Sequence, residues 1–461
     1  MCVCSGWIPV RKKTSQLTGL DMFKRASRPR VNEKASIYGT LICIILLAFA
    51  LRVVLWRYTH NLDFWQNGYG FFFSLAQGIA AGDGYAFHGG ATTAFRVPLY
   101  PMFLAGLTFG QQASFPIVVA QSLIGAGTVL CAAMIARELF GNTSAIIAAV
   151  LTAIYPYYVV HDTALQETSL YTFLIAVAMM LLLRARRSGS VATGAGAGFA
   201  LGAAVLTRAN LAPFALLAPF WLVLARGLNA APWRRKLCVA VLCASAGALT
   251  VSPWLIRSYR ITGTVSLSGQ PGLHLWLGNN PHTFIGYPEE SIDRTREAAF
   301  AALSDQERRE LEYNRNQAEV DKWYQQKAWE YIREDPWRTI GNGFRKNVAA
   351  FGWLPSPRHS FWPNLVYALS YGPVMVLGLW GMWVSRRQWQ EHSIFYMQFI
   401  AFVAVTMVYF GHTSYRSYLD VYWIVFAAAA LAASLSDATN YHLRGFLHQT
   451  KRSCHIVHAP E

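Results

Sequence analysis

Long apolar segments separated by short polar ones recur along most of this 461-residue chain. Most are near the length of about 20 residues that an α-helix needs to cross a bilayer, so the pattern predicts an all-α polytopic membrane protein with about 10–11 transmembrane helices. The predicted spans are residues 37–56, 116–137, 143–160, 167–184, 191–208, 211–226, 237–256, 361–384, 393–410 and 418–435. Residues 98–110 are also apolar, but this segment is short.

Short basic clusters between the apolar segments predict the orientation. RKK and KRASRPR precede the first span, RARR, WRRK and SRRQ lie between later spans, and HLRGFLHQTKR lies near the end. Basic loops stay in the cytoplasm, which places five segments outside: residues 57–97, 161–166, 209–210, 257–360 and 411–417. Because the net charge of +16 follows from these clusters, it does not indicate a nucleic-acid partner.

This orientation divides the chain into a cytoplasmic basic tail, an N-terminal transmembrane catalytic module, an extracytoplasmic loop, C-terminal transmembrane helices and a second cytoplasmic tail. These parts are residues 1–36, 37–256, 257–360, 361–435 and 436–461, and the first outer loop is residues 57–97. An even number of crossings must lie between Arg96 and His161, yet three apolar segments occur there. We therefore expect residues 98–110 to dip into the membrane or lie shallow; the alternative is that one loop is placed on the wrong side.

Three polar or small-residue segments predict local structure. In the first outer loop, FFFSLAQGI favours an amphipathic helix on the membrane surface, and GDGYAFHGG then breaks it. Residues 257–345 hold more than half of the 24 acidic residues, and their charges at helical spacing predict solvated helices. The glycine-rich segment 192–204 is typical of a close-packing helix face rather than of a nucleotide loop. The seven cysteines show no metal-ligand spacing.

Ionisable residues cluster on the predicted outer face, where they are costly to place in membrane helices and therefore candidates for function. They are Asp63, Arg96, His161, Asp162, Glu167, Arg208, Arg257, His412 and Arg416. Arginine side chains bind phosphate oxygens, and a carboxylate can accept a proton, so the group suits a phosphate-bearing substrate. A divalent cation could bridge the acids to a phosphate, although no ligand spacing demands one. The alternative is that each residue caps a helix or reaches to lipid headgroups.

Several of these residues lie in segments that resemble a known group. AQGIAAGDGYAF followed by TAFRVPLYPMFLA resembles the first-loop motif of GT-C membrane glycosyltransferases, the group of protein O-mannosyltransferases and aminoarabinose lipid A transferases. PWLIRSYRITGTVSLSGQPGLHLWLGNNPHTFIGY resembles a signature of the bacterial family 39-like members, and HTSYRSYLDVYWIVFAAAAL is similar to a later landmark. The resemblance covers about residues 37–435, and its GNNP segment is the most specific part.

The resemblance implies transfer of a sugar from a polyprenyl-phosphate donor, with inversion, on the outer side of a bacterial inner membrane. The acceptor would be an envelope glycolipid, a polysaccharide or a protein. An acid in the first outer loop would act as general base. In the family, this acid usually comes three residues before the aromatic residue that opens the next helix. If that residue is Phe72, the position is occupied by Tyr69. Asp63, the one acid ahead of this helix in the loop, is therefore assigned as the base.

The other roles follow from the same resemblance. Asp162 and Glu167 would support catalysis or a cation. The donor and its phosphate would be bound by Arg96, Arg208, Arg257, Asn279, Asn280, Tyr415 and Arg416. Two alternatives remain open: a carrier that moves a lipid-linked sugar without a base, and an inactive paralogue, which the departure at Tyr69 suggests.

Overall fold

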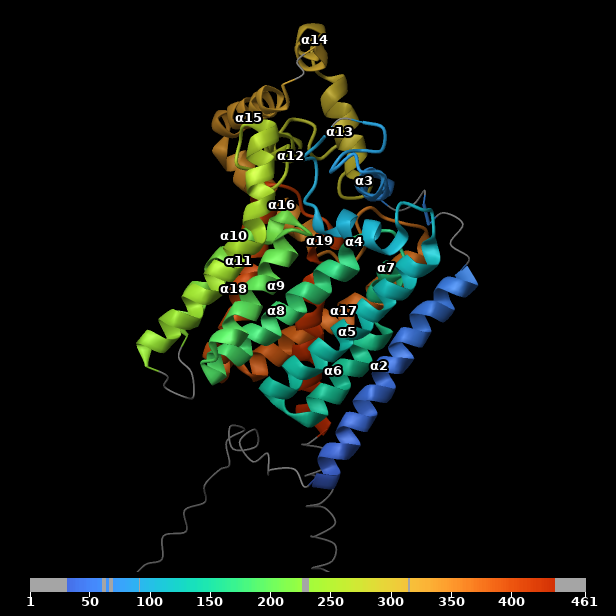
Figure 1. Ribbon diagram of the computed structural model, residues 1–461, viewed down its shortest axis with the longest axis vertical. Coiled ribbons are helices and arrows are strands. Elements are labelled where there is room, and N and C mark those ends of the chain that lie inside the picture. The colour runs from blue at the N-terminus through green and yellow to red at the C-terminus, as the bar shows by residue number, and fades with distance from the viewer. Residues whose placement is uncertain are drawn as a thin grey trace, which may run out of the picture.

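A computed structural model describes residues 31–59, 64–65, 69–90, 92–225, 232–313 and 316–435. A bundle of long apolar helices carries a smaller helical cap at one end, which we call the insertion end (Figure 1). Within the described ranges, the β-type pairing consists of one isolated bridge, between Ala86 and Thr92. The predicted all-α polytopic class is confirmed.

Seven helices of the described chain are long and apolar enough to cross a membrane. Five of them are single helices or lie within one: Ser36–Thr59 within α2 (Val31–Thr59), α5 (Ser114–Phe140), α8 (Thr168–Ser188), α11 (Trp233–Thr262) and α17 (Phe361–Val384). The sixth, Arg386–Val408, contains η2 (Arg386–Gln388) and α18 (Trp389–Val408). The seventh, Thr413–Leu435, begins with α19 (Thr413–Arg416) and η3 (Ser417–Leu419). An eighth span results if α6 (Asn142–Ile154) and α7 (Pro156–Asp162), which meet at a bend of 53°, are taken together.

The remaining two predicted spans are helical but short. They correspond to α9 (Val191–Val205) and to η1 (Ala209–Leu211) with α10 (Ala212–Leu224). Fifteen residues at 1.5 Å per residue extend about 22 Å, less than the hydrocarbon thickness of about 30 Å. The predicted 10–11 spans therefore exceed the seven or eight segments of the described chain that are long enough to cross. Here the helix ends at Val205, and the chain turns at Arg208 before α10 begins.

The glycine-rich segment in α9 is a packing face, as predicted. A Cβ atom on Gly198 would lie 2.0 Å from the carbonyl oxygen of Cys243 in α11, and Gly194 and Gly202 are similarly crowded by α11 residues. Without side chains at these positions, α9 approaches α11 closely and packs between it and α8. This short helix ends at the level where the polar residues of the insertion end begin.

The segment between Arg96 and His161 contains α4 (Leu99–Thr108), α5, α6 and α7. The ten residues of α4 are too few to cross a bilayer. Helices α5 and α6 form an antiparallel pair that turns at Gly141, whose φ of 95° favours glycine. The helix within 98–110 is therefore too short to cross, and α5 and the bent α6–α7 pair are the two candidate crossings between Arg96 and His161.

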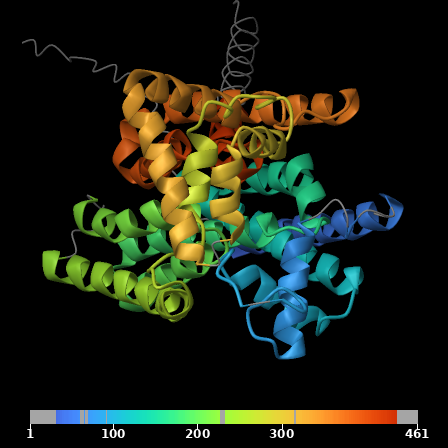
Figure 2. The ribbon, with the colours of Figure 1, turned by 90° about the horizontal axis from the view of Figure 1, so that it is seen from above.

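The insertion end combines two parts of the chain. The first is α3 (Gly70–Ala81), which ends at Gly82 with a φ of 86° where the sequence predicts a break. The second comprises α12 (Pro271–Gly278), α13 (Ile292–Ala301), α14 (Asp305–Tyr313), α15 (Gln317–Glu334) and α16 (Pro336–Ala350). From above, the loop after α3 borders these helices (Figure 2), and a contact between Arg96 and His274 of α12 joins the two parts.

Candidate functional site

The turn between α7 and α8 presents Glu167 at the insertion end, and buried hydrogen bonds hold this turn in place. The amide of Gln121 in α5 donates to the carbonyl oxygens of Asp162 (3.1 Å) and Ala164 (2.8 Å). The hydroxyl of Tyr100 donates to the Gln121 side-chain oxygen at 2.7 Å. Because these groups are buried, each bond is costly to break, and the position of Glu167 is fixed by residues of α4 and α5.

Glu167 and Arg208 form a buried ion pair. The Arg208 Nε atom lies 2.7 Å from Glu167 Oε1, and the exposed fractions of the two side chains are only 8% and 10%. The same guanidinium donates to Thr168 Oγ1 at 2.9 Å and to the carbonyl oxygen of Ser414 at 3.0 Å. Glu167 Oε2 is buried and has no hydrogen-bond partner among the described residues. The pair thus leaves one carboxylate oxygen and part of the guanidinium fork available to a ligand.

Arg96 provides a second cation at this end of the bundle. Its guanidinium stacks on the rings of Phe71 and Phe95 and lies 3.3 Å from Nε2 of His274. Burial, with the charges of Arg96 and Arg296, lowers the pKa of His274 to about 4, so this histidine is neutral at physiological pH. Within the described ranges, Arg96 has no carboxylate partner, and its positive charge is not neutralised.

The charges of both arginines act on Tyr69. Its backbone N–H donates to the carbonyl oxygen of Leu165 at 3.1 Å, beside the Glu167 turn. Desolvation raises the pKa of the Tyr69 phenol, Tyr415 and Glu167 raise it further, and Arg208 and Arg96 lower it. The phenol therefore stays protonated and lies within electrostatic reach of both arginines and of Glu167. This brings four of the predicted site residues, Arg96, Glu167, Arg208 and Tyr415, to one place.

His412 and Tyr415 approach the site from the start of the last span. The guanidinium of Arg208 lies over the Tyr415 ring, 5.7 Å from its centroid. His412 shares a hydrogen bond of 2.7 Å with the Ser414 hydroxyl. Burial, together with the charges of Arg208, His161 and His359, lowers the pKa of His412 to about 3. His412 is therefore a neutral hydrogen-bonding group rather than a cation for phosphate.

The structure gives Arg257 a different surrounding from the one predicted. Its two terminal nitrogens donate to the carbonyl oxygens of Thr93 (2.9 Å) and Tyr85 (3.0 Å). The Tyr85 hydroxyl in turn donates to the carbonyl of Arg96 at 3.0 Å. Arg257 thus anchors the loop that carries Arg96, and both of its terminal nitrogens are engaged by backbone carbonyls of that loop.

Arg416 is also engaged elsewhere. It is fully buried, pairs with Asp420 at 2.7 Å and donates to the Tyr367 hydroxyl at 2.7 Å. Tyr155 donates to the second oxygen of Asp420 at 2.9 Å. These contacts enclose the guanidinium within the bundle, so the expected contact with donor phosphate is not supported by its position. One buried atom, Arg416 Nε, has no partner among the described residues.

Asn279 and Asn280 of the GNNP segment form hydrogen bonds with backbone carbonyl groups. The Asn279 amide donates to the carbonyls of Leu275 (2.9 Å) and Val408 (2.8 Å), and the Asn280 amide donates to the carbonyl of Trp276 (2.8 Å). Both residues are buried. Asn279 fixes the end of α12 against α18, and Asn280 closes the last turn of α12, the helix that carries His274 next to Arg96. Their predicted binding role is therefore at most indirect.

Asp162 pairs with a residue that the sequence analysis did not select. Arg52, fully buried in α2, lies 2.6 Å from Asp162 through Nε and donates to the carbonyls of Ala48 and Ala153. A Cβ atom on Gly125 would lie 2.0 Å from Asp162 Oδ2, so glycine leaves the space for this pair. The single arginine inside an otherwise apolar predicted span was the available signal for it.

We expect Asp162 to contribute to stability rather than to catalysis. Asp162→Asn leaves Arg52 buried without its counter-ion, which typically costs about 3–5 kcal/mol. The Arg52→Met, Asp162→Leu double variant removes both charges and is expected to unfold close to the parental temperature. Thermal unfolding of the purified variants in nanodiscs measures this. A catalytic role for Asp162 would instead appear as parental stability with lost activity in Asp162→Asn.

Two further predictions concern Asp63 as the base and a bound divalent cation. Asp63 lies outside the described residues. No group of three or more histidine, cysteine, aspartate or glutamate side chains in the described ranges could hold a metal ion. The sequence analysis also overlooked Gln121, Lys346 and Asp420, which are buried polar residues in predicted spans or in the insertion.

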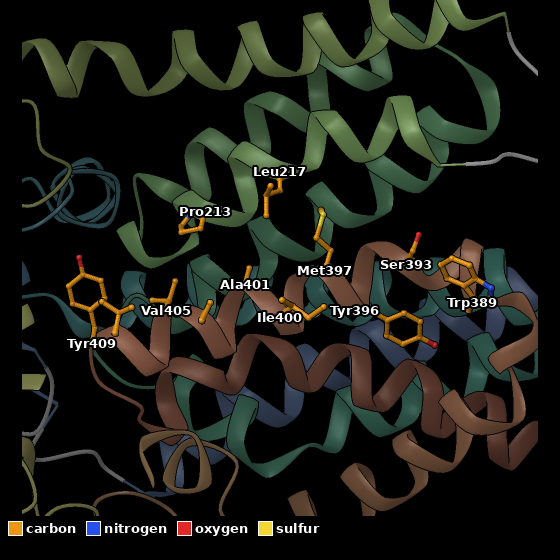
Figure 3. A pocket seen from close by; sticks show the side chains of 12 residues that line it. Pro213, Leu217, Trp389, Ser393, Tyr396, Met397, Ile400, Ala401, Val405 and Tyr409 are labelled. Atoms are coloured by element: carbon orange, nitrogen blue, oxygen red, sulfur yellow. The ribbon is translucent and has the colours of Figure 1, made fainter. Parts of the chain in front are cut away.

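An apolar groove runs along α10 and α18 close to this site. Its volume is about 560 Å³, and Figure 3 shows Pro213 and Leu217 of α10 facing the residues of α18 across it. The groove is lined by Pro213, Leu217, Trp389, Ser393, Tyr396, Met397, Ile400, Ala401, Ala404, Val405, Val408 and Tyr409. Pro213 follows Arg208 by five residues, and η1, between them, packs on α18. The groove therefore extends from near the Arg208 turn into the bundle surface.

Comparisons with known proteins agree with this architecture. The profile of the dolichyl-phosphate-mannose-protein mannosyltransferase family matches residues 96–256. No curated protein sequence matches the chain. The apo oligosaccharyltransferase of Archaeoglobus fulgidus is similar in structure, with a TM-score of 0.52 and 13% identity over 90% of this chain and 52% of that one. Its form tethered to an acceptor peptide gives a TM-score of 0.50 and 18% identity, over 89% and 51%.

A third similar structure is ArnT from Cupriavidus metallidurans bound to undecaprenyl phosphate, with a TM-score of 0.41, 14% identity and coverage of 87% of this chain and 79% of that one. This similarity is too low to add to the assignment. The chain spans about half the length of the archaeal enzyme. The chain therefore shares its fold with the archaeal enzyme, and residues 96–256 match the mannosyltransferase family profile.

Proposed function

We propose that this chain transfers a sugar from a polyprenyl-phosphate-linked donor to an extracytoplasmic acceptor in the envelope of a bacterium. The observation that carries the proposal is that Arg96 and the Arg208–Glu167 pair both lie within electrostatic reach of Tyr69, while an apolar groove begins at Pro213, five residues after Arg208. A polyprenyl-phosphate sugar combines an anionic phosphate with a long apolar chain, and these two features match the two parts of the site. The mannosyltransferase profile, named for a dolichyl-phosphate donor, supports the same class of substrate.

Arg96 and Arg208 are the proposed ligands of the donor phosphate. Arg96 has an un-neutralised guanidinium, and Arg208 keeps donor hydrogens beyond those that contact Glu167, Thr168 and Ser414. An arginine fork binds phosphate oxygens through two parallel hydrogen bonds. Arg257 acts on this site by anchoring the loop of Arg96. The polyprenyl chain would leave the phosphate near Arg208 and follow the groove between α10 and α18 (Figure 3).

The proposed reaction needs a carboxylate near the acceptor. The acceptor hydroxyl gives its proton to Asp63, in the loop before α3, while the acceptor oxygen attacks the anomeric carbon of the donor sugar. The bond from that carbon to the phosphate oxygen breaks, and the phosphate leaves with the bonding electrons. Attack opposite the leaving phosphate inverts the anomeric centre. Glu167 would hold Arg208 in position for the leaving group.

Mass spectrometry of envelope glycolipids, polysaccharides and proteins from a deletion strain tests this function. We expect one sugar-modified component to disappear, to return with the parental chain, and to stay absent with Arg96→Gln. Arg386→Gln is a matched control, because Arg386 is an exposed arginine in η2, which follows the end of α17 that is remote from the insertion. An envelope without any missing sugar would contradict the proposal. Loss of every glycoconjugate built from one lipid-linked sugar would favour the carrier.

The orientation of the site can be tested separately. Ser304 lies exposed at the insertion end, between α13 and α14, and Ser188 is exposed at the far end of α8. In a cysteine-free background, Ser304→Cys is expected to react with an impermeant maleimide in intact cells, whereas Ser188→Cys reacts only after lysis. This result follows if the basic clusters stay in the cytoplasm. The reverse labelling pattern would overturn the orientation.

A further inference from the structure

Helix α16 exposes an apolar stripe. The side chains of Trp337, Ile340, Phe344 and Val348 follow one another at spacings of three and four residues, which places them on one helix face. Their exposed fractions are 81%, 43%, 62% and 74%. Four large apolar side chains on one exposed face of a helix indicate a surface that contacts an apolar partner.

The opposite face of α16 is held firmly by the bundle. Lys346 Nζ is buried and donates to Asn279 Oδ1 (3.4 Å) and to the carbonyl oxygen of Met407 (3.2 Å). The Asn347 amide donates to the carbonyl of Val403 at 3.3 Å. Val403 and Met407 belong to the last two turns of the α18 span. These bonds fix α16 at the level where α18 reaches the insertion end.

Exposed apolar side chains follow the stripe along the chain as far as the α17 span. After α16, Trp353 and Leu354 are exposed in the connection to α17. The α17 span then begins with Phe361 and Trp362, which are 69% and 71% exposed. Tryptophan is enriched where membrane helices pass through the headgroup region, and indoles occur here at the start of α16, in the connection and at the start of α17. Exposed apolar side chains therefore occur on α16, in the connection and at the start of a candidate transmembrane helix.

We propose that α16 is an interfacial helix whose Trp337–Val348 stripe inserts into the bilayer leaflet at the insertion end. An amphipathic helix in this position buries its apolar face at the boundary between headgroups and acyl chains. Its inner face holds Asn279, and through it the end of α12, which carries His274 next to Arg96. The bilayer thus supports the insertion from one side and sets its height above the site. This role does not depend on which sugar or acceptor is used.

Nitroxide labels on α16 test the proposal in the full chain, with the native cysteines replaced. Labels at Phe344 and Val348 are compared with a label at Val366, on the exposed side of the α17 span, and with one at Gln326, exposed on α15. The proteins are reconstituted in nanodiscs of phosphatidylcholine with phosphatidylglycerol. Power saturation then measures collisions with oxygen, which concentrates in lipid, and with a water-soluble nickel chelate.

We expect Phe344 and Val348 to resemble Val366, with high oxygen and low nickel accessibility, and Gln326 to show the opposite. Nickel accessibility at Val348 equal to that at Gln326 would place the stripe in water and overturn the proposal. Exclusion of both reagents from Phe344 and Val348 would also overturn it, because a second copy or another protein would then cover the stripe. Parental thermal stability of each labelled protein ensures that the helix is folded during the measurement.

Discussion

Asp63→Asn is expected to lower sugar transfer by about 10²–10⁴-fold while leaving donor binding unchanged. A sugar hydroxyl is a weak nucleophile at neutral pH, and general-base catalysis typically contributes a factor of this size. Asparagine keeps the size and much of the hydrogen bonding of aspartate but cannot accept the proton. Single-turnover transfer with saturating donor, together with an independent binding measurement on the same protein, separates the two effects.

Asp83→Asn is the matched control for this experiment. Asp83 lies in the same predicted outer loop but follows α3, and it is exposed. The control is expected to transfer sugar at the parental rate. Full activity of Asp63→Asn would show that Asp63 is not the base. Glu167, whose buried Oε2 has no partner among the described residues, would then be the next candidate if Glu167→Gln loses transfer but keeps the parental donor KM. A carrier would lose little in either variant, because it deprotonates no acceptor.

Arg208→Lys should have the second largest effect, on use of the donor. Lysine keeps the charge, but it cannot reproduce a fork that contacts Glu167, Thr168 and Ser414 at once. Each lost hydrogen bond to a charged group is worth about 1.5–3 kcal/mol, or roughly 10- to 100-fold in an equilibrium constant. Loss of one such bond to the donor phosphate is therefore expected to raise the KM for the donor by at least about 10-fold.

The stability of the same variant decides how this loss is interpreted. Arg208 is buried, so Arg208→Lys is also expected to lower the unfolding temperature. Glu167→Gln, which removes the partner charge but keeps the arginine, serves as the comparison. A phosphate-binding Arg208 predicts that KM rises more in Arg208→Lys than in Glu167→Gln at similar unfolding temperatures. Equal changes in KM that follow stability in both variants would reduce Arg208 to a structural residue.

The sequence predicts those features that depend on local pattern. Apolar length predicts the helices of the bundle, and the glycines after Ala81 predict the end of α3. The small residues of α9 predict its contact with α11. Arg96, Glu167 and Arg208 are also found by pattern, because ionisable residues near apolar segments are rare. Each of these signals is contained in a short stretch of chain.

Partner identity is what the pattern does not contain. Asp162 and Arg52 are 110 residues apart, and only the fold shows that they neutralise each other. Arg416 looks like a phosphate ligand until Asp420 and Tyr367 are seen to enclose it. Asn279 and Asn280 carry the most specific motif, yet their amides bind carbonyls of the backbone. A residue type indicates what chemistry is available, whereas its neighbours determine whether that chemistry is used for structure.

The most direct measurement is transfer by the purified chain in nanodiscs. Polyprenyl-phosphate donors with different radiolabelled sugars are incubated with envelope components extracted from a deletion strain, and the anomeric configuration of the product is determined. We expect one donor to give a labelled product with inverted configuration and to release polyprenyl phosphate in equal amount. Absence of labelled product with every donor, or a product with retained configuration, would contradict this expectation.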